Sequence, residues 1–326
     1  MPERDLIQQL DQAVEAMLAG SAAAAAGPEV SELVKIAGWL RDLPDEAFRA
    51  QLRNDLQRAI RDSQKEKKTM TTATANWIRA GFTTLTPYLH VANAAAEIDF
   101  LKRVFAAEEL GRYASPDGSR IMHAELRIGD SMVEMGEPPE PKPTPLHVYV
   151  PDVDAAYRRA MEAGAISLYT PTDHEYGERG ASVRDAEGNH WYLATAAGAH
   201  YIPDGLHAVN IFLHPKGAPA LMEFLKRAFG AEEIQRHEAG GAVVHAQLKF
   251  GDSMLEMGEA HGPYPSMPCA IHYYVPDVDQ AYRRAVDAGA VSISAPTDQP
   301  YGERSAGVSD SHGNIWYLAT HISENH

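Results

Sequence analysis

An internal duplication of about 120 residues constrains this chain more than any other feature. Residues 146–195 read LHVYVPDVDAAYRRAMEAGAISLYTPTDHEYGERGASVRDAEGNHWYLAT. Residues 271–320 read IHYYVPDVDQAYRRAVDAGAVSISAPTDQPYGERSAGVSDSHGNIWYLAT, and about two-thirds of the aligned positions are identical. A repeat of this length is too long for a solenoid unit. We therefore expect two domains, each with its own hydrophobic core.

The duplication divides the chain into five segments. The four-residue spacing of Phe48, Leu52, Leu56 and Ile60 predicts a helical segment over residues 1–62. The polar, charged stretch that follows predicts a linker over residues 63–80. The repeats then span residues 81–197 and 205–322, and residues 198–204 link them.

Each repeat shows the order strand, helix, three strands, and shows it twice, which predicts an α+β fold. In the first repeat the pattern predicts a helix over residues 94–105 and strands over 121–128 and 131–135. It restarts with a strand over 146–150, a helix over 154–162 and a last strand around 191–194.

Composition and charge limit the classes of binding partner and the cellular compartment that we expect for this protein. The net charge is −16 and the repeats carry no basic block, which argues against nucleic acid and anionic membranes as partners. No apolar run approaches the roughly 20 residues that span a bilayer. The charged start of the chain does not resemble a signal peptide, and the single cysteine, Cys269, excludes a disulfide within the chain. We expect a cytoplasmic protein in which Cys269 is a buried structural residue, because the first repeat has Thr144 there.

Four segments then carry a family resemblance: TPYLHVANAAAEIDFLKRVFAAEE, HAELRIGDSMVEMGE, VPDVDAAYRRAMEAGA and GNHWYLAT. They resemble the glyoxalase/bleomycin-resistance/extradiol-dioxygenase (vicinal oxygen chelate) superfamily, with the strongest likeness to its PhnB-like branch. The resemblance implies tandem domains, each of paired βαβββ modules that form an open barrel around a small-molecule pocket. It also implies a possible divalent metal (Zn, Ni, Mn or Fe) and no nucleotide cofactor. Single-domain relatives form homodimers, so the tandem chain is expected to act as a monomeric pseudo-dimer or as a homodimer.

Strand alternation predicts which side chains face the pocket. Aliphatic residues such as Leu146 and Val148 should pack on helices, which turns the alternate residues inward. The candidates for acid–base catalysis are His123, Glu134, His147, His245, Glu256 and His272. The candidates for contact with the substrate are Thr86, Tyr88, Tyr149, Tyr192, Asn210, Phe212, Tyr274 and Tyr317. The alternative is that the His and Glu side chains form satisfied internal hydrogen-bond networks.

The family's metal-ligand positions carry over only in part. The first-strand position falls on Thr86 and Asn210, which are not usual ligands, and the next falls on Glu134 and Glu256, which match. The third falls on Pro145 and Ala270, but two residues later stand His147 and His272, on the same face. The fourth falls on Tyr192 and Tyr317, where metal-dependent members have Glu. Glu134, His147, Glu256 and His272 are therefore the candidate metal ligands. Within one repeat the set is incomplete, whereas a site shared between repeats would collect more groups.

Each YGER turn places an arginine, Arg179 or Arg304, near the mouth of its pocket. Each is a candidate clamp for an anionic substrate. The alternative is an ion pair across the hairpin, Arg179 with Asp185 and Arg304 with Asp310.

The sequence leaves three functions open. One is a lyase or isomerase that moves a proton beside vicinal oxygen atoms; a dioxygenase ranks below these, because the chain offers no facial triad for iron. The second is a protein that binds and sequesters a drug or metabolite, since the predicted pocket is rich in aromatic residues. The third is a scaffold that uses the helical segment. Whether the protein is an enzyme stays undecided at this level.

Overall fold

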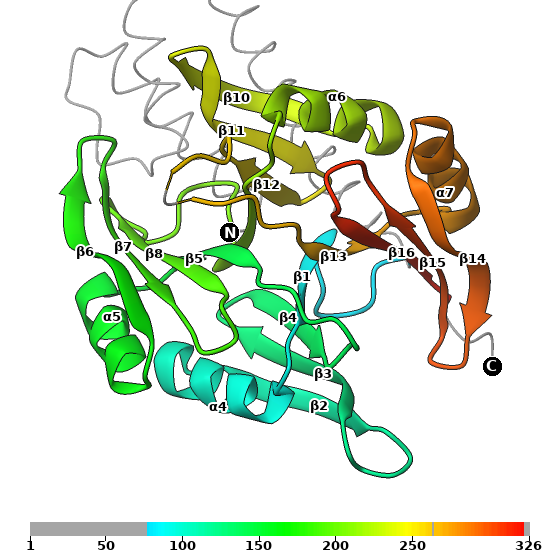
Figure 1. Ribbon diagram of the computed structural model, residues 1–326, viewed down its shortest axis with the longest axis horizontal. Helices are drawn as coiled ribbons and strands as arrows, with labels where there is room; N and C mark the ends of the chain where they lie inside the picture. The colour runs from blue at the N-terminus through cyan, green and yellow to red at the C-terminus, as the bar shows by residue number, and fades with distance from the viewer. Residues whose placement is uncertain (1–76, 263, 323–326) are drawn as a thin grey trace, which may run out of the picture. The chain divides into compact units, whose positions relative to one another are not determined.

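The computed structural model describes residues 77–262 and 264–322 (Figure 1). The predicted helical segment 1–62 and most of the predicted linker 63–80 lie outside these residues. The first repeat consists of β1 (Leu85–His90), α4 (Ala94–Phe105), β2 (Glu108–Ala114), β3 (Ile121–Ile128), β4 (Ser131–Gly136), β5 (Pro145–Tyr149), α5 (Val153–Glu162), β6 (Ile166–His174), β7 (Glu178–Arg184) and β8 (His190–Ala196). The second consists of β9 (Val209–Leu213), α6 (Ala218–Phe229), β10 (Glu232–Ala239), β11 (Ala242–Phe250), β12 (Ser253–Met257), β13 (Ala270–Tyr274), α7 (Val278–Asp287), β14 (Val291–Gln299), β15 (Glu303–Ser309) and β16 (Ile315–His321).

The predicted order of strand, helix and three strands is confirmed in all four halves. Helix α4 has the bounds that the apolar spacing predicts, because local signals set both ends. The Asn93 side chain accepts a hydrogen bond from the Ala96 backbone N–H at the start, and Ala106 adopts a left-handed conformation at the end. Within the described residues, no helix is long and apolar enough to cross a membrane.

The strands form two open eight-stranded sheets, and each sheet contains one half of each repeat. Sheet A has the order β14-β15-β16-β13-β1-β4-β3-β2, and sheet B has the order β10-β11-β12-β9-β5-β8-β7-β6. The repeats meet at the centre of each sheet. There β1 pairs antiparallel with β13, which sets Thr86 opposite His272, and β5 pairs antiparallel with β9, which sets His147 opposite Asn210. The concave face of each sheet is therefore built by both repeats.

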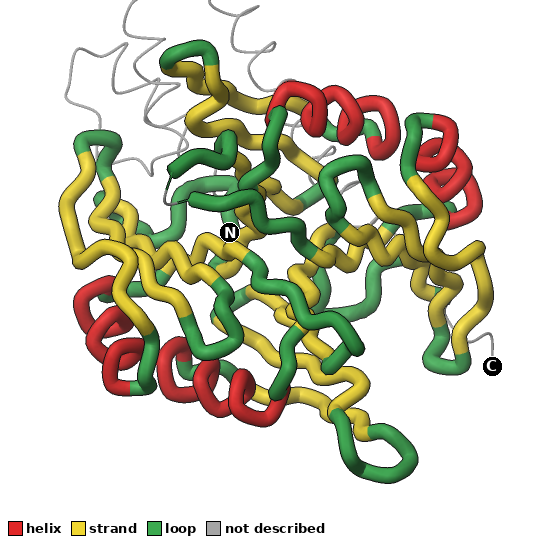
Figure 2. Tube along the Cα trace, in the orientation of Figure 1, coloured by secondary structure: helices red, strands yellow, loops and turns green. Residues whose placement is uncertain are grey.

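The hydrophobic cores, in contrast, are each built from the side chains of a single repeat. Trp191 of β8 packs on Phe100 and Phe105 of α4, with ring centroids 6.3 and 5.1 Å apart, although β8 belongs to sheet B and α4 covers β3 of sheet A. In the second repeat Trp316 packs in the same way on Phe229, at 4.7 Å. Figure 2 shows helices α4 to α7 of the described residues at the periphery, with the strands between them. The predicted packing of Leu146 and Val148 on helices is thus confirmed, because both are fully buried in this core together with Trp191.

The Gly-Asp-Ser turns join the two sheets. Asp130 accepts a hydrogen bond from the Ala208 backbone at the start of β9, and Asp252 accepts one from the Thr84 backbone before β1, both at 2.8 Å. Gly251, with φ +56°, lies so close to Thr84 that a Cβ there would stand 2.4 Å from the Thr84 Oγ1. Only glycine fits both the left-handed conformation and this close approach.

Candidate functional site

The concave face of sheet B holds a cavity of about 1100 Å³. Both repeats line it. The first repeat and the segment after β8 contribute His147, Tyr149, Tyr169, Tyr176, Glu178, Tyr192 and His200, and the second contributes Phe212, His214, His237, Val244, His245, Gln247, Glu256, His261 and Tyr264. Such a volume is in the usual range for a small-molecule site or slightly above it.

Glu256 of β12 is a fully engaged carboxylate at this cavity. Its Oε2 lies 2.7 Å from Nδ1 of His147, and its Oε1 lies 3.3 Å from Nε2 of His245 and accepts a hydrogen bond of 3.1 Å from the Gln247 amide. Burial works to raise the pKa of Glu256, but the positive charge of His147 and the hydrogen bonds hold that pKa well below its ordinary value. Glu256 is therefore ionised at neutral pH although it is 1% exposed.

His147 of β5 is the partner that faces the cavity. Burial works to lower the pKa of His147, but the charge of Glu256 and their shared hydrogen bond raise it above the ordinary value. Because Nδ1 is bonded to Glu256, that nitrogen carries a proton and the ring orientation is fixed. Nε2 makes no hydrogen bond with any described residue. This nitrogen remains available to a bound molecule.

Aromatic rings form the walls around this dyad. The Tyr149 hydroxyl donates to the Glu178 carboxylate at 2.7 Å, and the Tyr149 ring lies 4.5 Å from the His147 ring. On the other side, the Tyr192 hydroxyl lies 2.8 Å from Nε2 of His214, whose ring stacks on Tyr264 at 5.6 Å. A flat molecule in this cavity would therefore meet aromatic rings from both repeats.

The concave face of sheet A repeats the central dyad with the repeats exchanged. Nδ1 of His272 in β13 lies 2.7 Å from Oε2 of Glu134 in β4. Burial opposes the protonated imidazole, but Glu134 raises the pKa of His272. The Tyr274 hydroxyl donates to Glu303 at 2.5 Å, as Tyr149 does to Glu178. Both dyads therefore join a glutamate of one repeat to a histidine of the other.

In β3 of sheet A, Glu125 stands at the position where β11 of sheet B has Gln247. Arg79 binds Glu125 through two hydrogen bonds, of 2.5 and 3.0 Å, and His123 lies 3.2 Å from the same carboxylate. Burial alone would raise the pKa of Glu125, but His123 and Arg79 lower it to about 2. Ligand atoms of His123, Glu125 and Glu134 lie within 4.8 Å of one another, the one such group of three among the described residues.

The remaining polar candidates on these faces, apart from Thr86, have specific partners. Tyr88 lies 3.2 Å from Nδ1 of His123, and the Tyr317 hydroxyl lies 3.0 Å from Nε2 of His90. Thr86 is buried opposite His272, and its hydroxyl has no partner in the described part of the chain. Asn210 is bonded to the backbone of His207, so its amide serves the local structure.

The predicted pairing of Arg179 with Asp185 is wrong. Arg179 points away from the cavity and binds Asp154 of helix α5, at 2.6 and 3.0 Å, and Asp173, at 2.9 Å. Arg304 likewise binds Asp279 and Asp298 rather than Asp310. The buried aspartates accept hydrogen bonds from other groups. Asp185 accepts from the indole N–H of Trp191 at 2.6 Å, and Asp310 accepts from that of Trp316 at 3.1 Å. The clamp role for Arg179 and Arg304 loses its support, because these carboxylates already neutralise both guanidinium groups.

Sequence reasoning missed Glu178 and Glu303, which precede these arginines in the same motif. Alternation along β7 carries the signal: Arg179 and Ala181 face helix α5, so Glu178 and Gly180 face the cavity. Arg79 gave no such signal, because nothing in the sequence ties a residue before β1 to Glu125 of β3.

Comparison with known proteins identifies the family. The sequence profile of the Glyoxalase/Bleomycin resistance protein/Dioxygenase superfamily matches residues 81–193 and 209–318. The chain belongs to this superfamily. The matches do not single out the PhnB-like branch, which stays a prediction.

The chain is also similar to individual proteins in sequence and in fold. An uncharacterized protein of Mycobacterium bovis is 39% identical over 123 residues, which cover 33% of this chain and 80% of the relative. An uncharacterized protein of Mycobacterium tuberculosis is 39% identical, with 72% of the relative covered. Glyoxalase I from Zea mays is similar in fold, with a TM-score of 0.55 and 16% identity over 72% of this chain and 90% of that chain. A putative dioxygenase from Bacillus subtilis gives a TM-score of 0.50 at 12% identity, over 72% of this chain and 83% of that chain.

Proposed function

We propose that the sheet B cavity binds a small planar molecule with adjacent oxygen atoms, and that His147 transfers a proton to or from it. The observation that carries this proposal is the buried His147–Glu256 dyad, with Nδ1 and Oε2 2.7 Å apart and Nε2 free towards the cavity. The reaction class is that of a lyase or isomerase. General acid–base catalysis contributes about 10²–10⁴-fold, which suffices for proton transfer beside a carbonyl.

The neighbours of His147 have supporting roles. Glu256 is a positioning residue, because it fixes the imidazole tautomer and stabilises the protonated ring. The Tyr149 hydroxyl donates its proton to Glu178, so its oxygen lone pairs are left to accept from a hydroxyl of the bound molecule.

Superfamily members often use a divalent metal, and the residues of sheet A fit one. His123, Glu125 and Glu134 supply one nitrogen and two carboxylates, a set that suits Zn, Ni, Mn or Fe and leaves a position open. A metal there would polarise a ligand oxygen as a Lewis acid. To join such a site, Glu125 has to release Arg79.

The second candidate function is sequestration of a flat aromatic compound without chemistry. It is favoured by the rings of Tyr169, Tyr176, Tyr192, Phe212 and Tyr264, which all line the same cavity. Cytoplasmic location and the choice between monomer and homodimer stay predictions, and the scaffold role of residues 1–62 lies outside the described residues.

Hydrogen–deuterium exchange at carbon tests the enzymatic proposal. The full chain is incubated in D₂O with hydroxyacetone and dihydroxyacetone as probes, and exchange beside the carbonyl is followed by proton NMR. We expect exchange above the uncatalysed rate, reduced at least 100-fold in His147→Gln and retained in the sheet A variant His272→Gln. Exchange that is absent, or equal in His147→Gln, contradicts the proposal. Tight binding of a flat dye such as acridine that is weakened by Phe212→Ala would then favour sequestration.

A further inference from the structure

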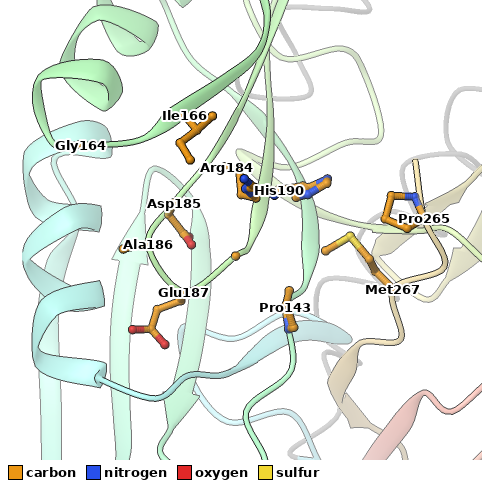
Figure 3. Close-up of a pocket in the computed structure, with 11 residues that line it drawn as sticks. Pro143, Gly164, Ile166, Arg184, Asp185, Ala186, Glu187, His190, Pro265 and Met267 are labelled. Atoms are coloured by element: carbon orange, nitrogen blue, oxygen red, sulfur yellow. The ribbon is translucent and has the colours of Figure 1, made fainter. Parts of the chain in front are cut away.

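Another cavity, of about 500 Å³, lies beside the turn between β7 and β8. None of its lining residues lines the larger cavity of sheet B. Figure 3 shows Arg184 and His190 close together, with Pro265 and Met267 on the chain segment opposite them and Pro143 below. Both repeats therefore contribute to this cavity as well.

Its two basic side chains form no hydrogen bond or ion pair with the side chains or backbone of the described residues. His190 is 6% exposed, and its side chain makes no hydrogen bond with any residue of 77–262 or 264–322. Since Nδ1 is buried with no acceptor nearby, the ring proton belongs on Nε2, which then serves as a donor. Arg184 lies directly opposite His190 across the β7–β8 pair, and over the same residues its guanidinium forms no ion pair.

The acidic groups around the cavity are already engaged. Asp185 accepts hydrogen bonds from the backbone N–H of Asn189 at 2.9 Å and from the indole of Trp191 at 2.6 Å. Glu187 accepts from the Ala92 backbone N–H at 2.5 Å. What the cavity offers a ligand is therefore a pair of N–H donors, one of them the guanidinium of Arg184.

We propose that this cavity binds the carboxylate of a small organic acid. Arg184 and the Nε2–H of His190 donate to the carboxylate, and the apolar part of the acid contacts Ile166, Pro265 and Met267. A guanidinium matches the two oxygens of a carboxylate, which favours this anion over a neutral acceptor.

The second repeat supplies matched control residues. At the positions of Arg184 and His190 it has Ser309 and Ile315, so the duplicated turn carries neither donor. Arg184→Ser and His190→Ile thus introduce side chains that an equivalent pair of strands, β15 and β16, already accommodates.

Calorimetric titration of the full chain with sodium benzoate, and with benzyl alcohol as the uncharged comparison, tests the proposal. We expect one benzoate per chain whose affinity falls at least tenfold in Arg184→Ser and in His190→Ile. We expect benzyl alcohol to bind at least tenfold more weakly than benzoate. Phe212→Ala, in the sheet B cavity, should leave this affinity unchanged.

Three results overturn the proposal. The first is no benzoate binding at concentrations up to about 50 mM. The second is wild-type affinity in both Arg184→Ser and His190→Ile. The third is loss of benzoate binding in Phe212→Ala alone. The last would place benzoate in the larger cavity. Failure here leaves the dyad proposal intact, because deuterium exchange by His147 involves none of these residues.

Discussion

Nδ1 of His147, in the first repeat, lies 2.7 Å from Oε2 of Glu256, in the second. His272 and Glu134 make the same contact, also 2.7 Å, with the repeats exchanged. Neither repeat contains a complete dyad on one sheet, because each sheet takes one half from each repeat. The duplication thus yields two composite sites rather than two separate ones.

Glu256→Gln should lower the pKa of His147. In the wild type Glu256 raises that pKa against the effect of burial, so without the carboxylate burial dominates and the imidazole becomes neutral below its ordinary pKa of 6.5. NMR titration of the His147 ring measures the change. The matched variant Glu134→Gln, on sheet A, should leave His147 as it is, and an unchanged His147 in Glu256→Gln would contradict the assignment.

The dyad should stabilise the fold most between about pH 4.5 and 6.5. The pKa of His147 is raised on folding, so its contribution is complete below 6.5 and is lost as the pH rises through the folded value. The pKa of Glu256 is lowered on folding, so its contribution is complete above 4.5 and is lost as the pH falls through the folded value. Urea unfolding over pH 3–9 measures the difference in unfolding free energy between the wild type and the double variant His147→Gln/Glu256→Gln. A difference that is flat across this range would count against the ion pair.

Glu97→Leu should stabilise the protein. Glu97 of α4 is 2% exposed, and one carboxyl oxygen has no partner among the described residues. Burial first, and then Asp185, raise the pKa of Glu97. The second repeat has Leu221 at the position of Glu97. There Nδ2 of Asn314 donates to Asp310 at 2.8 Å, whereas Nδ2 of Asn189 has no hydrogen-bond partner among the described residues. We expect a gain of about 1–3 kcal/mol in unfolding free energy.

The pH dependence separates this effect from simple repacking. A raised folded pKa means that wild-type stability falls as the pH rises above the ordinary value of Glu97, 4.5. The advantage of Glu97→Leu should therefore be larger at pH 8 than at pH 4.5 in chemical denaturation. An advantage that shrinks with rising pH would show that Glu97 is ionised at little cost.

Metal binding should depend on the cluster of His123, Glu125 and Glu134 on sheet A. In Glu125→Gln and Glu134→Gln, elemental analysis of protein purified without chelator should show less bound metal than in the wild type. Titration with Mn²⁺ should show an affinity weaker by about tenfold or more, because each variant removes a charged ligand. Arg79→Ala frees Glu125 and should strengthen uptake. Metal content that depends on Glu256 instead would place the site on sheet B.

The sequence predicts the local structure well, because local signals determine it. Helix α4 has the bounds expected from its apolar spacing, and alternation places His147 and Tyr149 at the cavity with Leu146 and Val148 in the core. The pairing of halves is not local. Since the repeats are so similar, β1 and β9 offer nearly equivalent edges to β5 and β13, and the sequence pattern cannot choose between pairing within and between repeats.

The errors at Arg179 and Arg304 have the same origin. The hairpin suggested Asp185 as the partner of Arg179, but alternation in β7 directs the guanidinium to Asp154 on the neighbouring helix. Arg79 could not be recognised either, since its pairing with Glu125 depends on how the segment before β1 lies over the sheet. Contacts that depend on tertiary packing were missed, and contacts set by strand periodicity were found.

A double-mutant cycle tests the shared-site account most directly. Unfolding free energies are measured at pH 6 for the wild type, His147→Gln, Glu256→Gln and the double variant, and for the same cycle with Glu134→Gln in place of Glu256→Gln. We expect a coupling of about 1–3 kcal/mol between His147 and Glu256, and less than about 0.5 kcal/mol between His147 and Glu134, although these last two belong to the same repeat. Strong coupling of His147 to Glu134, with none to Glu256, would contradict the account.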